Sequence, residues 1–459
     1  MKKGLIVIEA VAIVALLIAV AVSVVNAPSS DLGKDAQMAQ IIEGSGCLEC
    51  HVAEPELPFY ANLPVAGDIV KKDVAAGYRS FDVEPMYEAV KSGAKVSEVD
   101  LAKVEKVVCD GAMPPAKYYL AHWSSYMNDS KKSIAINWIS DARANFYPNP
   151  LAAAEFANET VRPIEDAVEV NPLKAALGEM LYHDTRLSVD NTVSCASCHG
   201  INTGGVDNKQ YSEGVNGQKG GVNAPTVFNA HYNFVQFWDG RAATLAAQAA
   251  GPPLNPVEMA SASFDEICAK LKADAAFDKA FTAVYPEGFT EQTITDAIQE
   301  YERTLLTPNS PFDKYLKGDK SAIGADEVEG YALFKKYDCA TCHVGENMGG
   351  QSYELMGIMN DYFADRGTEL TNEDNGRNKE TKLERDIHRF KVPGLRNVAL
   401  TAPYFHDGTQ ATLQEAVKAM GKYEVGVEID DAETAKVVAF LKSLTGEYKG
   451  KTLTNDNMK

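Results

Sequence analysis

Hydrophobic residues recur at helical spacing through most of the chain. The apolar positions of 133–146, 293–306 and 432–444 lie three and four residues apart, which predicts amphipathic helices that bury one face each. Another helix is predicted to begin at Thr412, because Thr412 and Glu415 form a capping box ahead of an apolar periodic run. We therefore expect a mainly α-helical protein.

One stretch is continuously apolar instead of periodic. Residues 4–25 contain two polar positions and follow two lysines, and at about 1.5 Å per residue they are long enough to cross a bilayer. A cleaved signal peptide is the alternative, with 25–27 as the cleavage site, although Pro28 directly after it disfavours cleavage. We expect an uncleaved transmembrane anchor over 1–27 in the inner membrane, with the rest of the chain in the periplasm.

Length and charge limit the remaining possibilities. A chain of 459 residues is long enough for about three domains with cores of their own. The formal net charge is −20, which argues against nucleic acid as a partner. An acidic surface attracts basic proteins such as small cytochromes, but it also serves solubility alone.

Six of the eight cysteines belong to three Cys-x-x-Cys-His motifs. This spacing is the signature of covalently attached haem c, because two thiols reach the two vinyl groups while the adjacent imidazole ligates iron. A zinc site would need paired motifs close together, whereas these lie about one small domain apart. We therefore predict three haems, on Cys47, Cys50 and His51, on Cys195, Cys198 and His199, and on Cys339, Cys342 and His343. The remaining Cys109 is expected to be buried or paired with Cys268.

The first haem needs a sixth ligand from the segment after its motif. Met113 is followed by two prolines, which favour an extended loop from which the thioether can reach iron. His122 is the rival ligand, and packing of Met113 in a core is the plain alternative. A pair of His51 and Met113 would give a relatively high potential, which suits an electron entry point.

The second motif is followed by a glycine-rich stretch, 200–221, without a histidine or methionine that could close the sixth position of iron. An open position suits a peroxide. The block that follows, with Asn223, Trp238, Gln248 and Glu258, resembles the bacterial di-haem cytochrome c peroxidase family. With the N-terminal motif added, the chain is similar to the membrane-anchored tri-haem branch of quinol peroxidases. The resemblance covers roughly 172–442.

The resemblance implies roles for three residues of this block. Glu258 would be the acid/base group for O–O cleavage, with a pKa raised by burial. Gln248 would orient the peroxide, and Trp238 would lie between the two haems and aid electron transfer. The plain alternatives are a helix-start carboxylate, a surface amide and a core aromatic. Many relatives carry a histidine ligand in the glycine-rich loop, and its absence from 212–217 implies an iron that is already open.

The resemblance also implies ligands in the third domain. The interval from His406 makes Met420 the sixth ligand of the electron-transferring haem, although Met420 also fits the apolar face of its helix. A tyrosine there would have indicated the MauG-like enzymes that oxidise a tryptophan of a partner protein. Weaker methionine candidates are Met348, Met356 and Met359. The family binds calcium between its haem domains, and the matching ligands are the Asn223 side chain and the carbonyls of Thr401 and Pro403.

These inferences combine into one architecture: a transmembrane helix followed by three cytochrome c-like domains. The predicted boundaries are 1–27 anchor, 28–40 tether, 41–147 first haem domain, 148–171 linker, 172–316 peroxidatic domain, 317–446 electron-transfer domain and 447–459 tail. The predicted function is reduction of hydrogen peroxide with electrons from a membrane quinol or a small cytochrome c. A non-enzymatic electron-transfer subunit is the alternative, and a MauG-like oxidase is disfavoured by Met420. The sequence leaves the donor and the oligomeric state open.

Overall fold

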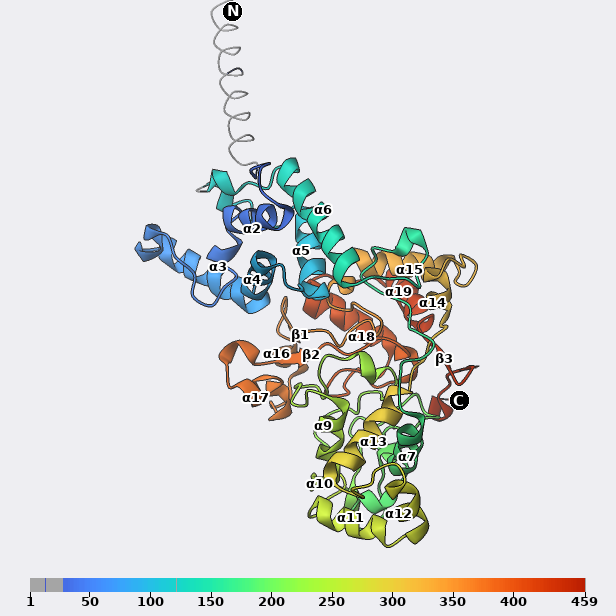
Figure 1. Ribbon diagram of the computed structural model, residues 1–459. Coiled ribbons are helices and arrows are strands. Elements are labelled where there is room, and N and C mark those ends of the chain that lie inside the picture. The colour runs from blue at the N-terminus through green and yellow to red at the C-terminus, as the bar shows by residue number, and fades with distance from the viewer. Residues whose placement is uncertain (1–12, 14–27, 121, 459) are drawn as a thin grey trace, which may run out of the picture. The chain divides into compact units, whose positions relative to one another are not determined.

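The computed structural model describes Ile13, residues 28–120 and residues 122–458 (Figure 1). The chain divides into two compact units, 1–149 and 150–459. Regular structure in the described residues is almost entirely helical, since the strands found there are two or three residues long. The expectation of a mainly helical protein is confirmed.

The expected membrane anchor needs correction. No helix among the described residues is long and apolar enough to cross a bilayer. The longest of these helices, α6 (Asp129–Phe146), has 18 residues but carries charges such as Lys131, Asp141 and Arg143. Apart from Ile13, the segment 1–27 on which the expectation rested lies outside the described residues. The structure therefore does not support the transmembrane helix or the inner-membrane location that was derived from it.

The first unit contains five described helices: α2 (Lys34–Gly44), α3 (Ala66–Ser80), α4 (Glu84–Ser92), α5 (Glu98–Asp110) and α6. The apolar faces of α2, α4, α5 and α6 meet in one core, to which α6 contributes Ala135, Trp138 and Ile139. A buried ion pair ties α5 to α6, because Arg143 donates from Nε to Glu98 Oε1 at 2.7 Å and both side chains are 2% exposed. The opposite charges of the two side chains compensate each other at a place that water does not reach.

The second unit begins with a helix pair around the second motif. Helix α7 (Pro172–Tyr182) packs along α13 (Glu291–Arg303), and Gly178 lies at their crossing. A Cβ atom at Gly178 would overlap the carbonyl oxygen of Ala297, so only glycine allows this close approach. Five shorter helices complete this part: α8 (Cys195–Cys198), α9 (Leu245–Ala249), α10 (Gly251–Leu254), α11 (Phe264–Lys272) and α12 (Ala275–Thr282).

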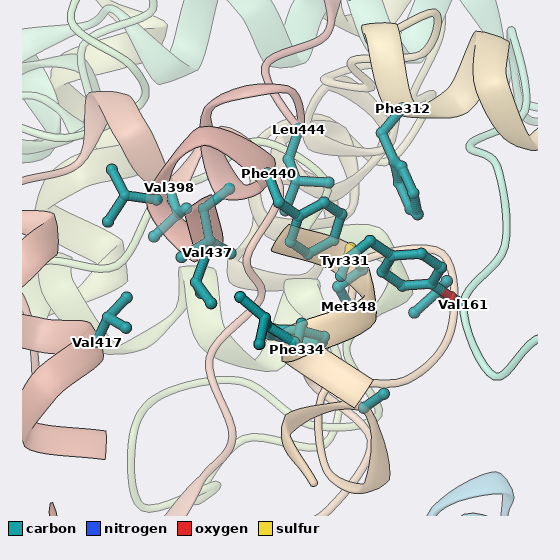
Figure 2. Close-up of a cluster of buried hydrophobic side chains, with 14 of the residues drawn as sticks. Val161, Phe312, Tyr331, Phe334, Met348, Val398, Val417, Val437, Phe440 and Leu444 are labelled. Carbon is teal, nitrogen blue, oxygen red and sulfur yellow. The ribbon is translucent and has the colours of Figure 1, made fainter. Parts of the chain in front are cut away.

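The part around the third motif repeats this packing. Helix α15 (Ala325–Lys336) crosses α19 (Asp431–Lys442) at Gly330, whose Cβ would overlap the carbonyl oxygen of Lys436. Figure 2 shows the core beside this crossing, in which the Phe440 ring meets Phe312 at 4.9 Å and Phe334 at 5.3 Å between centroids. The other helices here are α14 (Pro311–Leu316), α16 (Tyr362–Arg366), α17 (Asn378–Thr381) and α18 (Leu413–Met420). The capping box predicted at Thr412 and Glu415 is present.

Two short antiparallel strand pairs hold loops of this unit. Strand β1 (Tyr353–Leu355) pairs antiparallel with β2 (Arg389–Lys391), with Tyr353 opposite Lys391. Strand β3 (Glu447–Tyr448) pairs with β4 (Lys451–Thr452) in the segment predicted as a tail. The segment predicted as a linker, 148–171, contributes Phe156 and Val161 to the core of Figure 2. Both segments therefore pack against the body of the second unit.

Candidate active site

The three Cys-x-x-Cys-His motifs fold in the same way. Each forms a short helical turn, within 47–51, 195–199 and 339–343, and in each the histidine N–H donates to the carbonyl of the first cysteine at 3.0 Å. All six cysteines are free thiols. The turn therefore presents two thiols and one imidazole together, as covalent attachment of a c-type haem requires.

The imidazole of each motif is oriented by one hydrogen bond. Because a carbonyl oxygen only accepts, the Nδ1 atom must donate, and this leaves Nε2 as the free ligand atom. The three pairs are His51 with Phe81 O at 3.1 Å, His199 with Pro225 O at 3.0 Å and His343 with Met348 O at 3.0 Å. Burial lowers the pKa of His199, and lowers that of His343 to about 4, so both rings are neutral as ligation requires. The residues present thus fit haem c.

Glu258 lies close to the second motif. Burial raises the pKa of both Cys195 and Cys198, and the negative charge of Glu258 adds a smaller increase at each, so the carboxylate lies within electrostatic range of both thiols. Burial raises the pKa of Glu258 itself, against the opposing effect of Arg241 and of a hydrogen bond. That bond comes from Asn255, whose Nδ2 donates to Glu258 Oε1 at 2.6 Å. The side chain is therefore fixed in position with a proton affinity above that of an ordinary carboxyl.

The glycine-rich loop packs directly on the backbone of Glu258. The Val215 N–H donates to the Glu258 carbonyl at 2.8 Å, and a Cβ at Gly214 would overlap the carbonyl oxygens of Val257 and Glu258. A glycine at 214 therefore allows the loop to approach Glu258. This contact holds residues 214 and 215 of the loop against the backbone of Glu258.

Trp238 connects the parts around the second and third motifs. Its indole Nε1 donates to the Asn223 carbonyl at 2.9 Å, and its ring lies 6.4 Å from the rings of both Phe390 and His406. Gln248 is half-buried on α9, and its side-chain amide forms no hydrogen bond to another described residue. The structure thus brings Glu258 to the second motif and places Trp238 against the third-motif part, while the roles of these residues stay predictions.

The candidate sixth ligands differ in their surroundings. Met113 is 38% exposed, whereas both ring nitrogens of His122 have partners: Nδ1 bonds to Tyr118 O at 3.1 Å and Nε2 to the Tyr60 hydroxyl at 2.6 Å. His122 would have to leave the Tyr60 hydroxyl to bind iron through Nε2. Met113 therefore stays the predicted ligand.

In the third-motif part, Met420 ends α18 and is followed by a π-helical turn, 421–425. Such turns are frequent at functional sites. Met348 is fully buried in the core and accepts the His343 hydrogen bond through its backbone, while Met359 is 58% exposed. Met420 stays the predicted ligand of this haem.

The predicted calcium ligands come from two loops of the second unit. The Asn223 side chain donates from Nδ2 to Lys209 O at 2.9 Å, and its N–H donates to His406 O at 2.8 Å. Thr401 and Pro403 lie in a loop with a cis peptide bond between Ala402 and Pro403. Among the described residues, no group of three or more His, Cys, Asp or Glu side chains is placed to hold a metal ion. The predicted calcium ligands are one amide and two backbone carbonyls, which are not among these residue types, so calcium stays a prediction.

The prediction for the two spare cysteines was wrong. Cys109 is an exposed free thiol and Cys268 is also free. On α5 the preceding Val108 faces the core at 6% exposure, and one further helical step turns Cys109 outward.

Sequence reasoning missed three residues of this region. Asn255 was signalled by its position three residues before Glu258, within the block of matching intervals. Arg241, which opposes the effect of burial on Glu258, is also part of that block. Lys391 follows Phe390 in a segment of the third-motif part, and only the structure shows that it is buried.

The repeated motif geometry on a helical fold defines a covalent haem protein of the c-type cytochrome class. Comparisons with known families agree: residues 10–141 match a haem-binding domain, 172–321 match di-haem cytochrome c peroxidase and 327–445 match cytochrome c.

Individual relatives indicate a more specific group within this class, the peroxidases. The chain is 48% identical to cytochrome c peroxidase Ccp of Escherichia coli, over 92% of this chain and 90% of that protein. It is 44% identical to cytochrome c551 peroxidase of Nitrosomonas europaea, over 69% and 92%. A crystal structure of a MauG-like protein associated with microbial copper homeostasis is 29% identical with a TM-score of 0.55, and 61% of this chain and 91% of that one are covered.

The chain therefore belongs to the di-haem cytochrome c peroxidase family, and its relatives support a haem c-dependent peroxidase. The family expected from the motifs is confirmed, whereas the membrane-anchored tri-haem branch is not.

Proposed function

We propose that this protein is a tri-haem peroxidase that reduces hydrogen peroxide to water, with electrons entering at the first motif from a c-type cytochrome or a quinol. The names of two relatives, cytochrome c peroxidase and cytochrome c551 peroxidase, support the oxidant and a cytochrome donor. Three motifs with the same turn and the same oriented imidazole support three haems. The observation that carries the proposal is the position of Glu258 beside the second motif.

Haem c, when bound, supplies the redox-active iron of each motif. Reduction of peroxide to water consumes protons as well as electrons, so a proton must be held near the second motif and released there. Glu258 suits this role because burial raises its pKa and Asn255 fixes its Oε1 atom. The glycine-rich loop beside Glu258 offers no histidine or methionine, so the chain leaves this face open to a small oxidant.

The neighbouring residues have supporting roles in this proposal. The Gln248 amide, which forms no hydrogen bond to another described residue, is available to orient a peroxide or a water. Trp238 lies on the connection between the second and third motifs, held by its bond to Asn223. Met113 and Met420 would supply the second ligand of the haems at the first and third motifs, and Asn223, Thr401 and Pro403 would hold calcium. In this arrangement His199 would hold the one haem for which the proposal assigns no second protein ligand.

The test is the pair of variants Glu258→Gln and Glu258→Ala, assayed for peroxide consumption with a reduced donor. We expect turnover to fall by about 10²–10⁴-fold, because the proton-holding group is lost. Haem content is measured in parallel and is expected to be unchanged. Glu213→Gln is the matched control, since Glu213 lies in the same glycine-rich region but is bonded to Lys209 at the surface. Unimpaired turnover in both Glu258 variants would remove Glu258 from the mechanism.

Two further assays separate the donors and the alternative functions. Peroxide consumption is followed with reduced cytochrome c and, separately, with reduced quinol, and the faster reaction identifies the donor class. A non-enzymatic electron carrier would consume peroxide with neither donor. The likeness to a MauG-like protein makes oxidation of a partner protein the second candidate. In that case peroxide would be consumed only when the partner protein is present, and side chains of the partner would be oxidised.

A further inference from the structure

Lys391 is a buried lysine without a partner. It is 5% exposed in β2, and its ammonium forms no hydrogen bond or ion pair with any described residue. Lysine is almost never fully buried unless it is paired. Burial lowers its pKa to about 8, and no carboxylate among the described residues opposes this effect.

The neighbouring cations do not share this situation. Arg377 donates to the carbonyls of Asp239 and Gly240 at 3.1 Å, and Lys379 pairs with Glu373. In the first unit, Lys131 is also buried, at 4% exposure, but its Nζ donates to a backbone carbonyl at 3.3 Å. Each of these cations is satisfied by the chain itself, whereas Lys391 has no acceptor among the described residues and can take one from a bound group.

The position of Lys391 indicates which group that is. Its backbone N–H donates to Trp238 O at 2.8 Å, which places it beside the proposed connection between motifs. Two residues later, the Pro393 backbone lies within hydrogen-bond reach of the His343 ring and raises its pKa against the effect of burial. The segment 391–393 therefore runs from Trp238 to the imidazole of the third motif.

We propose that Lys391 is the counter-ion of a propionate of the haem held at Cys339, Cys342 and His343. A haem brings carboxylates into its pocket, and a carboxylate is the acceptor that a buried ammonium lacks. The ion pair keeps Lys391 charged, and this positive charge favours the reduced form of the nearby iron, which carries one positive charge less than the oxidised form. Lys391 thus acts as a positioning residue that raises the reduction potential of the third haem. This inference rests on the haem proposed at the third motif, and not on the peroxidase activity.

The test measures the midpoint potentials of the holoprotein by spectroelectrochemical titration in Lys391→Met and Lys391→Arg. We expect one midpoint to fall in Lys391→Met and to stay near the wild-type value in Lys391→Arg, which keeps the charge. The propionate bending modes in resonance Raman spectra should change in Lys391→Met alone. Lys335→Met is the matched control: Lys335 lies on α15, which leads into the third motif, but it is exposed and paired with Glu159 at 2.9 Å.

The proposal is overturned if no midpoint moves in Lys391→Met at full haem content, or if Lys391→Arg or Lys335→Met shifts the same midpoint equally. A Lys391→Met protein without haem at the third motif supports the proposal only if Lys391→Arg restores both the haem and the potential, and overturns it otherwise. Because potentials are measured without peroxide, failure of the peroxidase assay leaves this test intact.

Discussion

Glu302 should make the stability of the second unit depend on pH. The side chain lies on α13 at 6% exposure, and its Oε2 atom is buried without a hydrogen-bond partner among the described residues. Burial raises its pKa from 4.5 to about 8. The folded protein therefore keeps a proton on Glu302 at pH values where the unfolded chain has released it, and this difference opposes folding as the pH rises.

The sign and size follow from linkage. A carboxyl with a raised folded pKa contributes its full stability below pH 4.5 and loses it progressively as the pH rises through about 8. At ~1.4 kcal/mol per pH unit, the loss between pH 4 and pH 7 is about 3 kcal/mol. Glu302→Gln carries a neutral amide of similar shape, so its stability does not fall with pH in this way. We expect the variant to match the wild type near pH 4 and to be more stable than it by up to ~3 kcal/mol at pH 7.

The assay is urea unfolding of the holoprotein, followed by far-UV circular dichroism at several pH values between 4 and 8. Ile298→Val on the same helix is the control, because Ile298 is fully buried and carries no titratable group. Its cost of about 1 kcal/mol should be the same at every pH. A Glu302→Gln protein whose difference from wild type stays constant from pH 4 to pH 8 would refute the reasoning.

Two predictions concern packing. Gly178→Ala should lower the melting temperature by the equivalent of about 1–3 kcal/mol, because the added methyl overlaps a carbonyl oxygen of α13; a calorimetric scan with an unchanged midpoint would contradict this. In the first unit, Glu98→Ala should cost about 2 kcal/mol, since it removes the buried one of two carboxylates that each lie 2.7 Å from Arg143 and leaves Glu105 as the remaining partner. The double variant Glu98→Leu with Arg143→Met should recover most of that loss in urea unfolding, and an additive loss would argue against a charge effect.

The helices were largely predictable because their signals are local. The capping box at Thr412 and the periodic run of 432–444 correspond to α18 and α19. The helix predicted over 293–306 ends earlier, at Arg303, because Asn229 from a distant loop bonds to the backbone at both Leu305 and Thr307. A contact between segments so far apart leaves no trace in the periodicity of either one.

The residues of the site likewise fall into those that local sequence predicts and those that only the fold reveals. The spacing of cysteine and histidine identified all three haem motifs, because the attachment chemistry needs those residues next to one another in the chain. The carbonyls that orient the imidazoles lie elsewhere, such as Phe81 for His51 and Pro225 for His199. Likewise, the outward turn of Cys109 depends on which face of α5 meets the core.

By itself, the sequence determined the helical character and the family, and it predicted the haem attachment residues, since these depend on residue types at short, fixed intervals. The tertiary structure alone decided that Glu258 lies partly buried within electrostatic range of the second motif and that Lys391 is buried without an acceptor among the described residues. Proton affinity and charge pairing depend on which groups surround a side chain and on how far water is excluded. Those surroundings come from segments that meet only when the chain has folded.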